Sequence, residues 1–110
     1  MLHIYIDGDG CSVKDEHLEM IGQLTNLTKL NLSRNTDITE QGTSHLQNLE
    51  NLEYLNLYAT GVSDPTLDHI KGLSRLRSVF LWQSKVSPDK AAELRTARPG
   101  MTVDIGEKEV

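Results

Sequence analysis

The sequence has one cysteine, one tryptophan, one phenylalanine and three prolines among 110 residues. A single cysteine excludes an intrachain disulfide, a CxxC zinc pair and a CxxCH haem attachment. No apolar run reaches the roughly 18 residues of a membrane span, and no signal peptide precedes the first apolar segment. The net charge of -5 argues against nucleic-acid binding, which needs a basic surface. We therefore expect a soluble chain with no cofactor, whose compartment the sequence leaves open.

The sequence does contain pairs of apolar residues separated by one residue. These pairs begin at residues 4, 30, 55, 79 and 103, so successive pairs are 26, 25, 24 and 24 residues apart. A nearly constant period in the twenties is the sequence signature of a solenoid. Three consecutive segments, LTNLTKLNLSRN, LENLEYLNLYAT and LSRLRSVFLWQS, also share the pattern L-x-x-L-x-x-[LV]-x-L.

Each unit of this repeat predicts a short strand followed by a helix. The alternating pair indicates a strand with one buried face. Hydroxyls at Thr39, Ser63 and Ser87 are expected to cap the following helices, and Pro88 suits a first helical position. Helix-spaced apolar residues follow: Leu18, Ile21 and Leu24, then Leu46 and Leu49, then Leu67, Ile70 and Leu73, and finally Leu94 and Ala97. Such units bury their apolar faces by stacking on their neighbours.

These features resemble a leucine-rich repeat protein of the bacterial type with about 24 residues per repeat. The resemblance implies an α/β solenoid with a parallel β-sheet on the concave face and helices on the convex face. We expect one domain over 1–110, with repeats at about 3–28, 29–53, 54–77 and 78–101, a closing strand at 102–106 and a polar tail at 107–110. The ending LWQSKVSPDKAAELRTARPGMTVDIG is similar to C-terminal repeat modules of exported multi-domain bacterial proteins, which implies an exported parent.

The segment IYIDGDG places Asp7 and Asp9 directly after an apolar strand, as in a loop that holds a metal. Matching Asp7 and Asp9 to an EF-hand puts Tyr5 at the first ligand position, so that motif fails. Aligned by repeat, this loop carries two extra residues, and we interpret it as a plain loop. The opening also resembles a small bacterial family with a nuclease-like α/β fold, but the later strands lack the acidic residues of that fold. Weak calcium binding by the two carboxylates stays open.

The aromatic residues all fall at positions expected to point out of the concave face. Strand alternation sends the residues flanking each apolar pair to that face. Four aromatic side chains together reach the scale at which an exposed apolar patch marks a contact site. Cross-strand stabilisation of the sheet is the alternative interpretation. The predicted partner-binding residues are Tyr5, Asn31, Tyr54, Asn56, Tyr58, Phe80 and Trp82.

Other candidates for chemistry are weak. His45 and His69 occupy the same position in consecutive repeats, but two histidines without a third ligand predict no metal site. Ser78 has no base beside it, so a hydrolytic triad is not expected. Cys11 is predicted to be a buried, inert thiol. No catalytic or metal-binding residues are therefore expected, and the chain is predicted not to be an enzyme.

The sequence thus predicts a recognition module that binds a protein or peptide on its concave face. A carbohydrate on the same aromatic patch is a second ligand class. A structural or assembly module is the alternative, because the strand at His3–Ile6 would form an uncapped edge that pairs with a parent protein or with a second copy.

Overall fold

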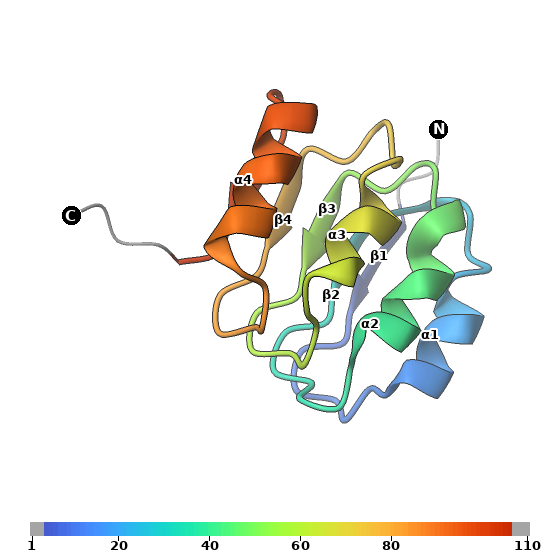
Figure 1. Cartoon of the computed structure of the whole chain (residues 1–110). Coiled ribbons are helices and arrows are strands. Elements are labelled where there is room, and N and C mark those ends of the chain that lie inside the picture. The colour runs from blue at the N-terminus through green and yellow to red at the C-terminus, as the bar shows by residue number, and fades with distance from the viewer. Residues whose placement is uncertain (1–3, 107–110) are drawn as a thin grey trace.

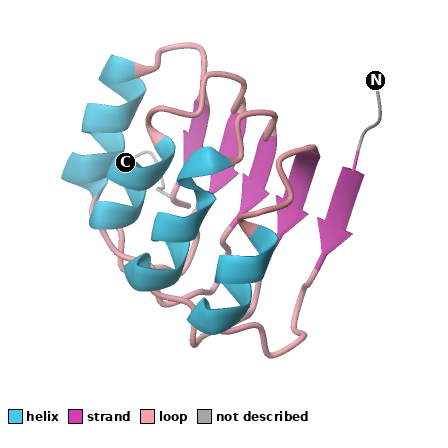
Figure 2. Ribbon diagram, turned by 90° about the vertical axis from the view of Figure 1, so that its right-hand side faces the viewer, coloured by secondary structure: helices cyan, strands magenta, loops and turns pink. Residues whose placement is uncertain are grey.

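The chain folds around one parallel β-sheet in the computed structural model, which describes residues 4–106 (Figure 1). The strands lie in sequence order: β1 (Ile4–Asp7), β2 (Leu27–Asn31), β3 (Tyr54–Asn56), β4 (Ser78–Phe80) and β5 (Thr102–Asp104). They are connected by α1 (Asp15–Ile21), α2 (Glu40–Thr43) with the 3-10 helix η1 (Ser44–Asn48), α3 (Pro65–Ile70) and α4 (Pro88–Ala97). Figure 2 shows these helices on one side of the sheet. The α/β class and the parallel sheet are confirmed.

Residue 3, where the first repeat was expected to begin, and the expected polar tail 107–110 lie outside the described residues. Within the described part, no helix is long and apolar enough to cross a membrane.

The repeat period sets the register of β2 to β5. Leu30 pairs with Leu55, Leu55 with Val79, and Val79 with Val103. All four side chains are at most 5% exposed. Because the spacing along the chain is nearly constant, each strand places its inward residue beside that of its neighbour. Their side chains form a continuous apolar layer between the sheet and the helices, as the sequence predicted.

The register of β1 differs from the prediction by two residues. Ile6, and not Ile4, pairs with Leu30. Gly8 therefore takes the position that Leu32 occupies in the next unit, and it is buried. A Cβ at Gly8 would lie 3.4 Å from Cγ2 of Val13 and 3.7 Å from Cδ2 of Leu32, so neighbouring side chains fill the space of the missing one. With this register the loop after β1 has no extra residues, and the expectation of a longer loop is wrong.

The hydroxyl caps are confirmed at two of the three predicted positions. The side chains of Thr39 and Ser87 accept hydrogen bonds from first-turn amides at 3.2 and 3.1 Å, and Pro88 begins α4. Ser63 is not a cap, because α3 begins one residue later and Asp64 holds the capping position. The Ser63 hydroxyl instead donates to a carboxylate oxygen of Glu40 on α2 at 3.0 Å.

Three side chains expected in the interior lie at the surface. Helix α1 ends at Ile21, so Leu24 falls in the following turn and is 43% exposed. Ala97 is exposed at the end of α4. Cys11 is exposed in the loop after β1, so the prediction of a buried thiol is wrong.

Candidate functional site

The sheet face opposite the helices displays three rows of side chains. Strand pairing defines the first row as Tyr5, Lys29, Tyr54, Ser78 and Thr102. It defines the second row as Asp7, Asn31, Asn56, Phe80 and Asp104. Two residues further along each chain segment, a third row consists of Asp9, Ser33, Tyr58, Trp82 and Gly106. Because the rows run across neighbouring strands, residues far apart in the sequence become neighbours.

Four aromatic side chains border one hollow on this face. The hollow has a volume of about 280 Å³, and we call it the aromatic hollow; its lining residues are Tyr54, Asn56, Tyr58, Phe80, Trp82 and Asp104. The rings of Tyr54 and Phe80 have centroids 5.5 Å apart and planes inclined by 48°. Such a tilted contact between neighbouring strands stabilises the pair and fixes how the rings stand.

The indole of Trp82 is held in place by the end of β5. Its Nε1 donates a hydrogen bond of 2.5 Å to Oδ1 of Asp104. Gly106 has a φ of +74°, and a Cβ there would lie 2.8 Å from Cδ2 of Trp82. The glycine therefore lets the backbone lie against the indole, which still keeps 47% of its surface exposed. Trp82 is oriented by the structure and open to a partner at the same time.

The amide side chains on this face support the backbone. Oδ1 of Asn56 accepts from the amide of Tyr58 at 2.9 Å, and Oδ1 of Asn31 accepts from that of Ser33 at 3.0 Å. These are Asx-type turns, in which a side chain closes the chain two residues on. Nδ2 of Asn56 also donates to the hydroxyl of Tyr54 at 3.3 Å. Both amides therefore shape the loops after their strands, a role that the sequence reasoning missed.

The structure brings five of the seven predicted site residues together in the aromatic hollow. Tyr5 lies apart, because Lys29 of β2 separates it from Tyr54 by two strand spacings, roughly 10 Å. It is 55% exposed and borders a neighbouring hollow of about 660 Å³ that also includes Tyr54. Asn31 lines neither hollow. Asp104 also lines the aromatic hollow, and it was not among the predicted residues although strand alternation in the closing segment places it on this face.

In the acidic loop after β1, the carboxylate of Asp9 forms an ion pair with Arg34. Oδ2 of Asp9 lies 2.5 Å from Nη2 of Arg34, and Oδ1 accepts from the Ser33 hydroxyl at 2.7 Å. The hydrogen bonds from Arg34 and then Ser33 lower the pKa of Asp9 to about 2, and the same pair raises the pKa of Arg34. Oδ1 of Asp7 accepts from the Asp9 amide at 3.1 Å. Within residues 4–106, no three His, Cys, Asp or Glu side chains are placed to hold a metal ion.

The two aligned histidines differ in their surroundings. His45 is exposed on η1, whereas Nδ1 of His69 lies 3.1 Å from the Thr43 hydroxyl. This contact holds the ring of His69 against Thr43 at the end of α2.

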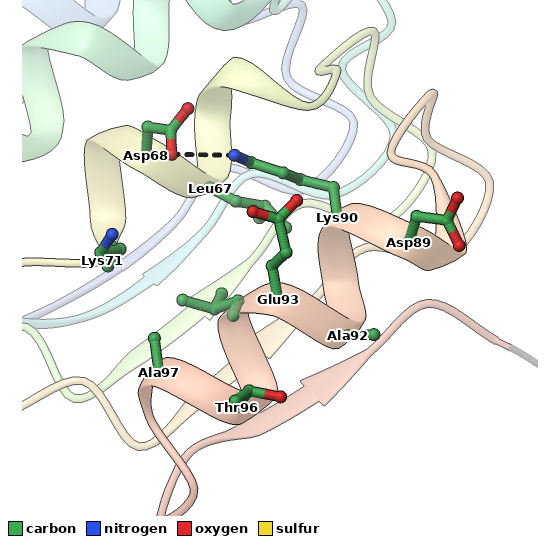
Figure 3. A pocket seen from close by; sticks show the side chains of 10 residues that line it. Leu67, Asp68, Lys71, Asp89, Lys90, Ala92, Glu93, Thr96 and Ala97 are labelled. Atoms are coloured by element: carbon green, nitrogen blue, oxygen red, sulfur yellow. Dashed lines mark hydrogen bonds and ion pairs between the residues drawn. The ribbon is translucent and has the colours of Figure 1, made fainter.

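A further hollow of about 500 Å³ lies between α3 and α4 (Figure 3). Lys90 reaches from α4 to Asp68 on α3, with 3.0 Å between Nζ and Oδ1. This hydrogen bond lowers the pKa of Asp68 and raises that of Lys90. Leu67 and Leu94 form its apolar floor. The hollow is the solvent-facing seam between two packed helices, closed in part by an ion pair.

No protein-family model matches this chain, and no curated protein matches it significantly.

Proposed function

We propose that the chain is a leucine-rich-repeat solenoid that binds a protein or peptide through its aromatic hollow and carries out no chemical reaction. Its repeating hydrogen bonds support the repeat class. Side-chain donors of Asn35, Thr60 and Ser84 each bond the carbonyl three residues earlier, at 2.8, 2.8 and 2.7 Å. The leucine-rich-repeat pattern places Asn or Cys at this position, and Cys11 occupies it in the first unit.

The backbone after each strand supports the same proposal. The residues Gly10, Arg34, Ala59 and Gln83 have φ values of 64°, 60°, 55° and 56°. Three of these four are not glycine, and non-glycine residues adopt this left-handed conformation rarely, so its recurrence at the equivalent position of four units indicates a copied local structure. The amides of the first three donate to carbonyls of the next unit at 2.7 to 2.9 Å. Stacked copies bonded in this way are what a solenoid consists of.

The observation that carries the binding function is the placement of the aromatic side chains. None of the five is buried in the core; Tyr5 and Trp82 are exposed and the others are half-buried. An aromatic side chain can bury about 150–250 Å² in an interface. Tyr and Trp are enriched among the residues that dominate binding energies. The exposed part of this aromatic area lies on one sheet face, where a partner can bury it.

The groups around the hollow favour binding over catalysis. They are four rings, one amide and one carboxylate. Nucleophilic catalysis needs a nucleophile within hydrogen-bond reach of a base, and these groups supply no such pair. Rings and an amide instead provide stacking area and polar contacts for an extended ligand.

Selection of a random peptide library displayed on phage tests the proposal. Peptides enriched on the wild-type chain should lose binding to the Tyr58→Ala, Trp82→Ala double variant. The matched control is the Met20→Ala, Leu24→Ala double variant. Met20 lies on α1 and Leu24 in the turn after it, and their side chains are 73% and 43% exposed. Circular dichroism checks that both variants fold. Peptides that bind all three proteins equally would place the binding surface elsewhere.

Two alternatives give different results. A carbohydrate ligand would show in a titration of Trp82 emission with a neutral oligosaccharide such as chitohexaose. An assembly module would form concentration-dependent oligomers through β1, which pairs only with β2 among the described strands. Light scattering over a range of concentrations is the test here, because Ile4 packs against the core and a charge at that residue would disturb folding.

A further inference from the structure

The aromatic hollow carries the carboxylate of Asp104 on its β5 side. Oδ1 of Asp104 accepts hydrogen bonds from Trp82 and from the Gly106 amide, at 2.5 and 2.9 Å. Oδ2 makes no hydrogen bond, and the carboxylate makes no ion pair, with any residue in the described range 4–106. One oxygen of Asp104 therefore holds the indole, while the other is available to a ligand.

The rings beside this carboxylate attract positive charge as well. The face of an aromatic ring carries negative partial charge, and Trp binds cations best among the aromatic side chains. Phe80 pairs directly with Asp104 across β4 and β5, and Trp82 bonds to it. The carboxylate and the rings would therefore both attract a cation bound in the aromatic hollow.

Basic side chains are absent from the lining of the hollow among residues 4–106, where no Lys or Arg borders it. Lys29 lies beside Tyr54 on the β2 side, and the charge of Arg34 is paired with Asp9. The β5 side of the hollow is thus acidic and aromatic, within a chain of net charge -5. Complementary charge favours a basic partner and speeds its encounter with the surface.

We propose that the aromatic hollow binds the guanidinium or ammonium group of a basic peptide, against Phe80, Trp82 and Asp104; this rests on the function proposed above. The volume of about 280 Å³ lies below the range of roughly 300–1,000 Å³ typical of sites for drug-sized ligands. It suits one side chain of an extended peptide. A guanidinium can stack on a ring while its N–H groups donate to Oδ2 of Asp104.

The single tryptophan gives a direct reporter of this binding. Its indole N–H produces one cross-peak in a ¹H–¹⁵N spectrum, and that N–H is bonded to Asp104. The probes are an N-acetylated Gly-Ser-Arg-Gly-Ser-Arg-Gly-Ser amide and the same peptide with citrulline, the neutral isostere, in place of arginine. A cation–π contact and an exposed charge pair each contribute about two- to five-fold in affinity. We expect the arginine peptide to bind about ten-fold more tightly at low ionic strength.

A charge-only variant isolates the carboxylate. Asp104→Asn keeps Oδ1 as the acceptor for Trp82 and removes the charge. This variant should lower the affinity for the arginine peptide about two- to five-fold and leave the affinity for the citrulline peptide unchanged. Asp89→Asn, on the exposed start of α4, makes the same change in net charge away from the hollow and should have no effect.

The possible outcomes separate this inference from the proposed function. Equal binding of both peptides, or equal effects of the two Asn variants, would overturn the cation site and leave peptide binding in place. Tighter binding of tetramethylammonium than of the arginine peptide would assign the hollow to a small quaternary ammonium ion and overturn the peptide. Absence of any indole shift with these probes would also overturn the inference, while the phage selection decides separately whether the hollow binds peptides at all.

Discussion

Truncating Asn35 to alanine removes a buried side chain that joins the loops after β1 and β2. Asn35 is 2% exposed. Its Oδ1 accepts from the amide of Val13 at 2.8 Å. Its Nδ2 donates to the carbonyls of Gly8, Leu32 and Ser33 at 2.9, 2.8 and 3.2 Å. The side chain thus satisfies backbone groups of two repeats at once.

The cost follows from the groups left without a partner. The carbonyls of Gly8 and Ser33 each accept another hydrogen bond from a backbone amide. The Val13 amide and the Leu32 carbonyl have no second partner in the described range. A buried polar group left unpaired costs about 1–3 kcal/mol, and Val13 is only half-buried, so water relieves part of its loss. We expect Asn35→Ala to lower the free energy of unfolding by about 2–4 kcal/mol.

Urea unfolding followed by circular dichroism measures this loss. A domain of this size has a stability of roughly 5–15 kcal/mol, so the midpoint should fall clearly. The control is Asn48→Ala, an exposed position on η1 where the change should stay within about 0.5 kcal/mol. If the two variants were equally stable, the buried hydrogen bonds of Asn35 would not hold the loops together, and the reasoning would be wrong.

Three further predictions concern separate parts of the molecule. Asp9→Asn removes the ion pair with Arg34, so above about pH 4 the variant should be less stable than the wild type. The pKa of Asp9 is about 2 in the folded state and 3.8 ordinarily, so the difference in free energy of unfolding between the two proteins should shrink as the pH falls between these values, as acid unfolding would measure. Gly106→Ala should cost about 1–2 kcal/mol through its left-handed backbone and displace the indole of Trp82, seen as a shift in its emission maximum, whereas an unchanged spectrum would contradict the close contact. Leu55→Ala, fully buried in β3, should cost about 2–5 kcal/mol in urea unfolding, and a loss below 1 kcal/mol would mean that the core there is loosely packed.

The sequence was sufficient for the strand order because one period is copied along the chain. Leu30, Leu55, Val79 and Val103 recur at spacings of 25, 24 and 24 residues and meet in register. A slip by one residue would turn a whole strand inside out, so the apolar pattern strongly specifies the pairing. The same alternation predicts the aromatic residues on the open face of the sheet, where the structure has them.

The pattern failed at β1 because a glycine replaces the expected apolar residue. The apolar pair Ile4 and Ile6 imitates the pairs of later repeats, whereas the true equivalent is Ile6 followed by Gly8. Whether neighbouring side chains can fill the space above a glycine depends on packing between repeats. The side-chain pattern of one segment does not contain that information.

The orientation of the site residues was also beyond the sequence pattern. Alternation predicts that Trp82 points outward, but its direction depends on the Asp104 carboxylate and on the space left by Gly106. Likewise, Asn56 is suited by type to contact a ligand, yet its Oδ1 is used by the amide of Tyr58. Side chains that serve their own backbone cannot be separated by residue type from side chains that serve a partner.

The two ends of the third row show how one backbone supports different surfaces. At the β1 end, Asp9 and Ser33 bond to each other and the carboxylate is paired with Arg34. At the β5 end, the equivalent positions carry Trp82 and Gly106, and Asp104 beside them has no cation partner in the described residues. Because the backbone and its Asx-type turns recur, these differences in side chain change the surface without changing the fold. The β1 half is thus closed by its own charges, and the proposed recognition surface lies between β3 and β5.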